Sequence, residues 1–367
     1  MINEKNITLC TGCGVCASVC PVKCIEISLD AYGFYKPTVD VEKCTKCDLC
    51  DRVCTIDDVS EDREVLQSLS AYTKNEDILL STSSGGVCYE ISKWGLENGY
   101  KVCAVVYNYE KQRAEHFVII EKEQLEGAKG SKYFQSYTYD AFSKIFDGEK
   151  WVVIGTPCQI AAIDKAAKLR KIRDNYVLID FFCHGVPSMH VWKNYLKDHN
   201  DKKIAKIGFR SKELGWGKWS LNFTYSDGTT KSDSADNLFY KLFFSNACLN
   251  DSCYECKFKA LKSCADIRVG DFWGKKHEAN KKGVSGILVF TEIGKDILSK
   301  TQKVFVLNDE AVEDVLDGQM FKSPEKLKVR KRLLKVLGKG KKLGYIYKVT
   351  LFPTRLKSVI KSKLRGR

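Results

Sequence analysis

Two short stretches of this sequence each carry four cysteines at the same spacing. They are CTGCGVCASVCP, residues 10–21, and CTKCDLCDRVCT, residues 44–55. In such a Cys-x2-Cys-x2-Cys-x3-Cys run, three thiolates on a tight loop reach three corners of one [4Fe–4S] cube, and the fourth caps the other cube. The spacing therefore predicts two clusters, one held by Cys10, Cys13, Cys16 and Cys54 and the other by Cys44, Cys47, Cys50 and Cys20.

Other uses of these cysteines fit the sequence less well. Zinc sites prefer paired knuckles with four ligands in total, and disulfide frameworks suit short secreted chains. This chain has 367 residues, 17 cysteines and a start, MINEKNITLC, without an apolar signal region. We expect a cytoplasmic protein that uses its thiols for metal. Thr55, where a second proline is usual, and the extra Cys24 depart from the pattern without removing a ligand.

A third cysteine group lies far along the chain, in CLNDSCYECKFKALKSC. It consists of Cys248, Cys253, Cys256 and Cys264. Four thiols within 17 residues could hold a third [4Fe–4S] cluster, but the spacing is not a standard run. Zinc takes four thiolates equally well, and free buried cysteines are common, so both alternatives remain open.

Two small-residue strings have the character of anion-binding loops. Ser83, Ser84, Gly85 and Gly86 precede a helical pattern, where backbone N–H groups and the helix dipole would face a phosphate. Such a string is more often only a cap and a turn. Gly130, Ser131 and Lys132 could bring a lysine to the same diphosphate or to a flavin ring, or could form a plain surface loop.

The string Gly155, Thr156, Pro157, Cys158 and Gln159 stands where a strand runs into a helix. Pro157 suits the first helical turn. Cys158 would then lie beside the helix N-terminus, which would lower its pKa and make it a ligand, nucleophile or redox thiol. A small residue packed under a cofactor is the alternative. His184, in a Cys-His-Gly string at the end of the next strand, could transfer protons or be structural.

The elements around these residues alternate between strand and helix. Strands are expected at 102–107, 116–120, 151–154 and 176–183, and helices at 87–99, 140–147, 157–172, 188–199 and 235–247. Strand, turn, helix, strand is typical of parallel α/β folds, in which ligands lie at the carboxyl ends of strands. We therefore expect a small dicluster domain (1–60), a mixed α/β body in two parts (66–150 and 151–325) and a tail (326–367).

The tail carries nearly all of the excess charge. Residues 326–367 hold 16 Lys and Arg and no Asp or Glu, while the remainder has 44 basic and 46 acidic residues. A nearly neutral body gives no support for nucleic-acid binding. Two apolar stripes run through the tail: Leu327, Leu333, Leu334 and Leu337, and then Leu356, Val359, Ile360 and Leu364. They suit contact with an acidic partner or the inner face of a membrane, or a solvated extension.

Six strings in this order resemble the coenzyme F-420 hydrogenase/dehydrogenase beta-subunit family over residues 66–325. They are STSSGGV, GSKYFQS, IGTPCQIAA, DFFCHGVPS, SCYECKFK and ADIRVGDFWG. The resemblance implies FAD as a cofactor, bound on the face formed by residues 83–86, 130–132 and 155–159, in a flavoprotein with iron–sulfur clusters. Combined with the first two cysteine runs, it implies a ferredoxin domain fused to a flavin-binding body.

These expectations lead to one principal hypothesis and two alternatives. The first is an oxidoreductase that moves electrons between a two-electron carrier (a reduced deazaflavin, a nicotinamide or a substrate) and one-electron iron–sulfur acceptors. The second is a non-catalytic electron-transfer subunit that serves a partner enzyme. Some members of the resembled family are associated with surface-polysaccharide gene clusters, so this partner could act in surface-polysaccharide biosynthesis. The third is a redox sensor that responds to cluster loss or to oxidation of Cys158.

Overall fold

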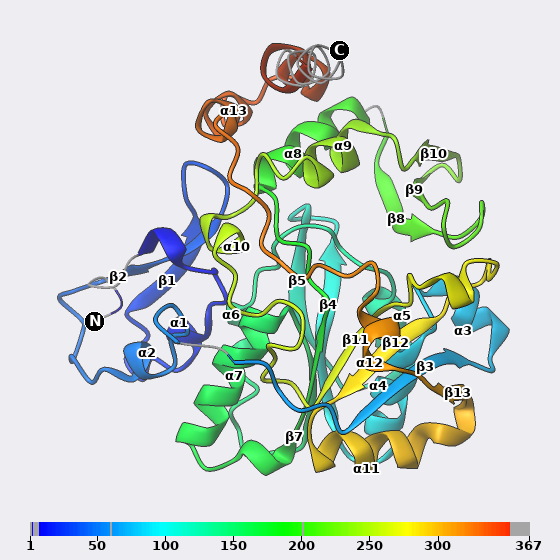
Figure 1. Ribbon diagram of the computed structural model, residues 1–367. Coiled ribbons are helices and arrows are strands. Elements are labelled where there is room, and N and C mark those ends of the chain that lie inside the picture. The colour runs from blue at the N-terminus through cyan, green and yellow to red at the C-terminus, as the bar shows by residue number, and fades with distance from the viewer. Residues whose placement is uncertain (1, 3–6, 59–60, 200–201, 353–367) are drawn as a thin grey trace, which may run out of the picture.

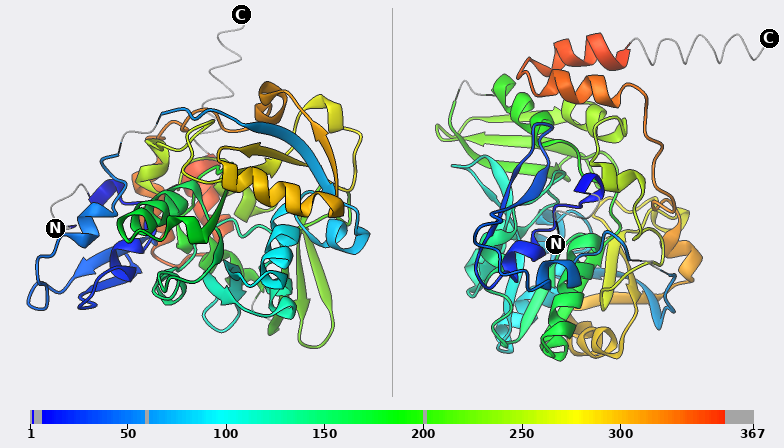
Figure 2. Two further views of the ribbon diagram at one scale, coloured as in Figure 1. Left: turned by 90° about the horizontal axis from the view of Figure 1, so that it is seen from below. Right: turned by 90° about the vertical axis from the view of Figure 1, so that its left-hand side faces the viewer.

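The computed structural model describes all residues except 1, 3–6, 59–60, 200–201 and 353–367. It shows an N-terminal domain on one side of a larger mixed α/β body, with the C-terminal helices packed at one end (Figures 1 and 2). A mixed α/β body behind a small ferredoxin domain is the fold class that the sequence predicts.

The N-terminal domain is built from one hairpin and two short helices. Strands β1 (Ile25–Leu29) and β2 (Tyr35–Val39) pair antiparallel. Helices α1 (Val15–Ser18) and α2 (Leu49–Arg52) each follow a cysteine loop. Because each helix has only four residues, its stability depends on what it packs against. Helix α1 packs against the body, where Val15 and Val19 join a core cluster with Phe142 and Ile163.

One eight-stranded sheet forms the centre of the body. Its spatial order is β13 (Phe305–Asp309), β3 (Gln67–Thr73), β12 (Ser285–Val289), β11 (Ile267–Asp271), β7 (Tyr176–Phe181), β6 (Trp151–Ile154), β4 (Lys101–Asn108) and β5 (Arg113–Ile119). Strands β11, β7, β6 and β4 are parallel neighbours, and the other pairs are antiparallel. Segments 66–150 and 151–325 therefore share one sheet, since β3 pairs with β12 and β13.

The strand direction collects several loops at one edge of the sheet. The parallel strands β4, β6, β7 and β11 all end there, and so does β3, because it runs antiparallel to β12. Ligands in such sheets lie outside the carboxyl ends of the strands. A second sheet of β8 (Ile204–Ser211), β9 (Ser220–Tyr225) and β10 (Thr230–Ser234) lies above this edge in Figure 1.

Helices cover both faces of the large sheet, and the period-2 alternation of its strands decides which residue faces which layer. Helices α4 (Val87–Glu97), α5 (Leu125–Ala128) and α11 (Glu292–Thr301) share a core cluster with Val152 and Val177. Helices α6 (Tyr139–Phe142) and α7 (Pro157–Leu169) share another with Val153 and Leu178. The helix expected at 140–147 is thus much shorter in the structure.

The remaining helices lie outside these two layers. They are α3 (Glu76–Ser81), α8 (Met189–Leu196), α9 (Leu238–Phe244), α10 (Asp251–Tyr254), α12 (Val312–Leu316) and α13 (Arg330–Leu337). Helices α8 and α9 pack on the small sheet in a core with many aromatic rings. In the described part of the chain, no helix has both the length and the apolar character needed to cross a membrane.

The beginning of the tail belongs to the core. Leu333, Leu334 and Leu337 of α13 are almost completely buried, and residues 343–352 continue as a helix on the same side. Arg330 donates to the backbone oxygen of Leu249 and pairs with Asp251. The first apolar stripe therefore packs against the protein itself and does not form a membrane-facing surface. The second stripe (Leu356, Val359, Ile360 and Leu364) lies outside the described residues.

Candidate functional site

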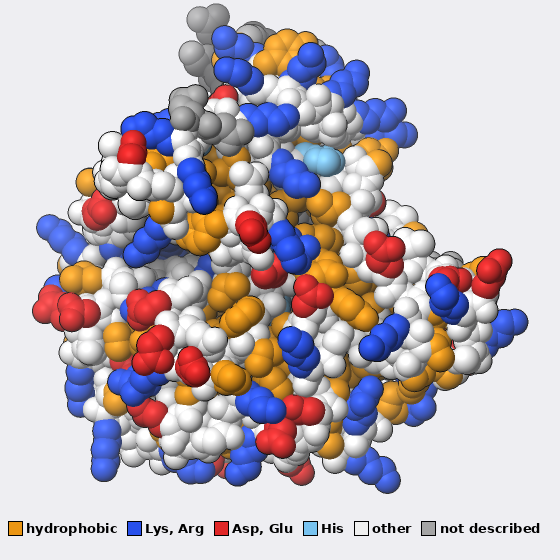
Figure 3. Space-filling model, turned by 180° about the vertical axis from the view of Figure 1, so that it is seen from behind, with side chains coloured by type: hydrophobic (Ala, Val, Ile, Leu, Met, Phe, Trp, Pro, Cys, Tyr) orange, Lys and Arg blue, Asp and Glu red, His pale blue; other side chains and the backbone are white. Residues whose placement is uncertain are grey.

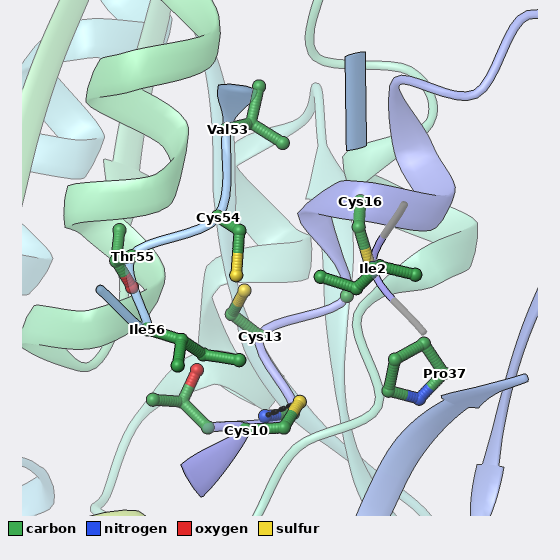
Figure 4. A pocket seen from close by; sticks show the side chains of 12 residues that line it. Ile2, Cys10, Cys13, Cys16, Pro37, Val53, Cys54, Thr55 and Ile56 are labelled. Atoms are coloured by element: carbon green, nitrogen blue, oxygen red, sulfur yellow. Dashed lines mark hydrogen bonds between the residues drawn. The ribbon is translucent and has the colours of Figure 1, made fainter. Parts of the chain in front are cut away.

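Two hollows in the N-terminal domain are each lined by four cysteines. The first is lined by Cys10, Cys13, Cys16 and Cys54. Figure 4 shows the sulfur of Cys54 beside that of Cys13, although the two residues come from different cysteine runs. The structure thus brings together the four thiols that the spacing assigns to one cluster, including the exchanged fourth ligand.

The loop around the first hollow is shaped by glycines. Gly12 and Gly14 have φ values of 70° and 77°, which other residues rarely adopt. A Cβ on Gly12 would lie 2.1 Å from Nε2 of Gln135, so the loop also docks closely on the body. The backbone N–H of Gly12 donates to Sγ of Cys10 at 3.3 Å. Burial raises the pKa of Cys13 to about 12. A metal centre would supply the positive charge that a buried thiolate needs.

The second hollow is lined by Cys20, Cys44, Cys47 and Cys50, with Cys24 beside them. The N–H of Lys46 donates to Sγ of Cys44 at 3.4 Å, and Sγ of Cys24 lies 3.5 Å from Sγ of Cys20. Cys47 is exposed, whereas Cys10 and Cys16 in the first hollow are buried. Four sulfur donors with N–H groups aimed at sulfur fit a [4Fe–4S] cluster in each hollow, and the second is the one nearer solvent.

A third group of thiols forms at the edge of the large sheet. Burial raises the pKa of Cys158, and electrostatic repulsion from Cys183 and Cys256 raises it further. The same two thiols also add to the effect of burial on the pKa of Cys253. The N–H groups of Val186 and Phe258 donate to the sulfurs of Cys253 and Cys256, at 3.4 Å and 3.5 Å. Strand ends β6 and β7 and helix α10 therefore present four thiols to one another.

This group is not the quartet expected from the sequence. Cys248 is fully buried under α9, with its Sγ 3.5 Å from the oxygen of Leu242. Cys264 lies near Asp164 of α7, which helps burial to raise the pKa of the thiol to about 11. The chain around α10 turns Cys248 and Cys264 away from Cys253 and Cys256, and two strand ends supply the neighbours instead.

The expected properties of Cys158 also change. Cys158 is the second residue of α7, as predicted, but burial raises the pKa of its thiol well above the usual range and outweighs the helix N-terminus. A free reactive thiolate is therefore not favoured at this position. Within the described residues, no three His, Cys, Asp or Glu side chains are grouped tightly enough to hold a single metal ion.

Two basic side chains whose roles the sequence does not predict support the third group. Nζ of Lys259 donates to the backbone oxygens of Cys183 and His184, at 2.6 Å and 3.1 Å. The buried pair of Arg268 and Asp180 (2.6 Å) fixes the segment after α10, because Arg268 also donates to the oxygen of Ala260. The string ADIRVGDFWG contains Arg268, but its partner stands 88 positions away, so no local signal shows the pair.

His184 lies next to the third group. Burial lowers its pKa, so the ring is neutral near pH 7. Nε2 of His184 lies 2.7 Å from Oδ1 of Asn246, and a hydrogen bond donated by Nε2 fixes the orientation of the ring. The ring centre lies 4.8 Å from that of Phe243. Its second nitrogen is then an acceptor, which is compatible with proton transfer and equally with a structural role.

The predicted phosphate loop of Ser83 to Gly86 lies at the same edge of the sheet, between β3 and β12. Oγ of Ser84 donates to the oxygen of Val284 at 2.8 Å, and the N–H of Gly85 donates to Oγ of Ser285 at 2.9 Å. A Cβ on Gly85 would lie 2.1 Å from the oxygen of Ala71, so only glycine fits. Gly86, with φ of 82°, starts the 11-residue helix α4. This arrangement fits a phosphate at a helix N-terminus.

The loop of Gly130 to Lys132 joins the first one. The N–H of Ser131 donates to Oγ of Ser83 at 2.8 Å. Nζ of Lys132 donates to four backbone oxygens, and burial lowers its pKa to about 7. The four acceptors are Val105, Gly127, Ala128 and Lys129. Lys132 therefore anchors this loop to the end of α5, and the structure does not show it reaching a ligand.

The residues from Gly155 to Gln159 belong to the third cysteine group. Oγ1 of Thr156 lies 3.2 Å from Sγ of Cys158, and Oε1 of Gln159 accepts from the N–H of Thr156 at 2.9 Å. Pro157 is the first residue of α7. Nε2 of Gln159 donates to Oγ of Ser136. The expected cofactor face thus has two parts, one formed by the serine–glycine loops and one facing the cysteines.

Comparisons with known proteins fit this geometry. Residues 9–57 match the model of the 4Fe-4S dicluster domain. Residues 148–314 match the family model that describes the C terminus of the coenzyme F420 hydrogenase/dehydrogenase beta subunit. The coenzyme F420 hydrogenase subunit beta of Methanococcus voltae is 24% identical over 261 residues, which cover 68% of this chain and 86% of that protein.

The fold itself has a known counterpart. A chain of the F420-reducing [NiFe] hydrogenase complex from Methanosarcina barkeri matches 80% of this chain and 94% of its own length, with a TM-score of 0.50 and 18% identity. At this identity, the likeness concerns the fold alone. Residues 9–57 therefore resemble a 4Fe–4S dicluster domain, and residues 148–314 resemble the C terminus of the coenzyme F420 hydrogenase/dehydrogenase beta subunit.

Proposed function

We propose that this protein is an iron–sulfur flavoprotein oxidoreductase that passes electrons between a two-electron carrier and one-electron acceptors. The proposed cofactors are FAD and three [4Fe–4S] clusters. The observation that carries the proposal is the position of the third cysteine group. Cys158 interacts electrostatically with Cys183 and Cys256, and also with Cys13 of the first hollow. Three groups of four thiols thus follow one another from the exposed Cys47 to the edge of the large sheet.

The structure also offers a connection from the third group to the serine–glycine loops. The ring of His184 lies 4.8 Å from that of Phe243, which lies 5.6 Å from that of Tyr133. Tyr133 follows directly on the loop that contains Ser131. A cofactor held by the loops would therefore lie at the same edge of the sheet as the cysteines, separated from them by a short series of aromatic rings.

FAD fits the loops because glycine permits close approach and the N-terminus of α4 offers N–H groups to a diphosphate. Ser83 and Ser131 are joined to each other through hydroxyl and backbone groups, so both loops are held in place before a ligand binds. When bound, a flavin supplies the exchange between hydride transfer and single-electron transfer. The chain itself contributes binding and orientation.

Lysines at the thiol groups would stabilise the negative charge that each cluster gains on reduction. Nζ of Lys36 donates to the oxygen of Cys10 at 2.7 Å and to Oδ1 of Asn250 at 3.3 Å, between the N-terminal domain and the body. Its charge also acts on Cys253. With Lys259 on the other side, the proposed path from the third group to the first is lined with positive charge.

A second candidate function is electron transfer without a substrate of its own. Cys47 is exposed at the outer hollow, where a redox partner protein could dock. The related chain from Methanosarcina barkeri belongs to a hydrogenase complex. In this alternative, electrons would enter or leave through the clusters, and the serine–glycine loops would have no cofactor.

Cofactor content separates the two candidates. Protein purified without oxygen should contain about twelve iron atoms and one flavin if all three clusters and FAD are present. Reduced deazaflavin or NADH should then bleach the flavin and the cluster absorption together. Eight irons and no flavin, even after addition of FAD, would refute the oxidoreductase proposal and leave the electron-transfer subunit.

A further inference from the structure

One buried arginine at the junction of the two sheets has unused hydrogen-bonding capacity. Arg210 is the penultimate residue of β8, and its side chain is 4% exposed. Its Nη1 binds Oδ2 of Asp271 at the end of β11. Nε and Nη2 are buried and have no acceptor at regular hydrogen-bonding geometry among the described residues, although the phenol of Tyr133 interacts with the guanidinium.

Indole rings enclose this guanidinium. Cζ of Arg210 lies 5.0 Å from the ring centre of Trp219 and 5.2 Å from that of Trp273. Trp216 stacks on Trp273 at 5.5 Å with an interplanar angle of 3°, and its Nε1 donates to Oδ1 of Asp271 at 2.8 Å. Trp273 is 40% exposed, so the enclosure opens to solvent on one side. The guanidinium plane is therefore held in a fixed orientation by Asp271 and the indoles.

The donors that remain define the chemistry of a ligand. Nε and Nη2 form the side of the guanidinium fork that binds two oxygens of a carboxylate or phosphate. Nε1 of Trp219 is a third buried donor without a partner among the described residues. A buried N–H group without an acceptor destabilises the folded protein. These three donors outnumber the phenol oxygen of Tyr133 that interacts with the guanidinium, so an oxyanion would complete their hydrogen bonds.

The surroundings connect this fork to the proposed cofactor site. Tyr133, which follows the loop with Ser131, interacts electrostatically with the guanidinium. Two residues after Arg210, Nζ of Lys212 donates to the oxygen of Ser84 at 2.7 Å. The space-filling view from behind shows apolar side chains gathered across the middle of the molecule (Figure 3).

We propose that Arg210 and Trp219 bind a phosphate or carboxylate group of a redox ligand, which completes the hydrogen bonds of the fork. The inference rests on the proposed function, because it takes this edge of the large sheet to hold a flavin or its electron donor. Two sources share this chemistry: the diphosphate of FAD, and an anionic group of the two-electron donor. Asp271 holds the arginine in place and contributes no donor to the ligand.

The test uses full-length protein with its clusters intact, stripped of flavin, and inorganic pyrophosphate as the probe. Equilibrium dialysis compares the wild type with Arg210→Gln and Arg210→Lys. Lys218→Gln is the matched control, because it removes one positive charge from the exposed loop nearby. Iron content and melting temperature verify that each variant is folded. We expect Arg210→Gln to weaken pyrophosphate binding by at least about tenfold, Arg210→Lys to restore it only in part, and Lys218→Gln to behave as the wild type.

Flavin reconstitution and donor affinity identify the source. Loss of FAD from Arg210→Gln assigns the fork to the cofactor. Retention of FAD with weaker binding of NADH or reduced deazaflavin assigns it to the donor. The inference fails if Arg210→Gln binds pyrophosphate like the wild type, if the wild type does not bind it, or if neither FAD nor a donor is affected. A wild type that never binds flavin would instead refute the proposed function.

Discussion

Replacing Cys256 tests the composition of the third cysteine group. The structure places Cys256 with Cys158, Cys183 and Cys253, so Cys256→Ala would remove one of the four ligands of the proposed third cluster. Iron should fall from about twelve to about eight atoms per chain, and the spin count after full reduction from about three to about two. Iron analysis and electron paramagnetic resonance on protein purified without oxygen measure both numbers.

Cys264→Ala is the matched control for this experiment. Cys264 stands eight positions later but lies beside Asp164, away from the other thiols. It should therefore keep about twelve irons. The reasoning is refuted if Cys264→Ala loses four irons, which would restore the quartet suggested by sequence alone, or if Cys256→Ala loses none.

Three further predictions concern the loop, the acid stability and the tail. Gly85→Ala should lose flavin but keep its iron, since a Cβ there would lie 2.1 Å from the oxygen of Ala71, and flavin absorbance checks this. Burial lowers the pKa of His116 to about 4, below about 6.5 in the unfolded chain. The unfolded chain then binds more protons between these values, so stability should fall as the pH drops below 6.5, by up to about 1.4 kcal/mol per pH unit. Denaturant unfolding at pH 7.5 and 5.5 should show a smaller loss in His116→Gln. Leu337→Ala should lower unfolding stability by about 2–5 kcal/mol, because the residue is fully buried; unchanged stability would argue for an exposed tail.

The strands and most helices of the body could be predicted because their patterns are local. Residues 102–107 form an apolar run with turn residues on both sides, and β4 covers Lys101–Asn108. The helix that starts at Val87 shows its apolar face and the glycines before and after it, Gly86 and Gly99, within one segment. The helix expected at 140–147 is shorter, because its apolar residues pack under β5 and against α1 without continuing the helical turn.

The two N-terminal cysteine quartets could be assigned from the sequence alone. Their ligands lie on short loops whose spacing fixes which thiols can share a cube, so no distant contact has to be known. It also determined that loops with glycine and serine stand at strand ends.

Only the tertiary structure decided the third group and the role of the tail. Cys158 and Cys183 meet Cys253 and Cys256 because β6, β7 and β11 lie side by side, a pairing between segments some 90 residues apart that no local pattern encodes. Likewise, Arg210 meets Asp271 only where two sheets join. An amphipathic stripe indicates that the apolar face of a helix will be buried, but not what buries it. In the folded protein, the body buries Leu333 and Leu337. These contacts join residues far apart in the sequence. They could not be predicted from local patterns, because they depend on how all the elements pack together.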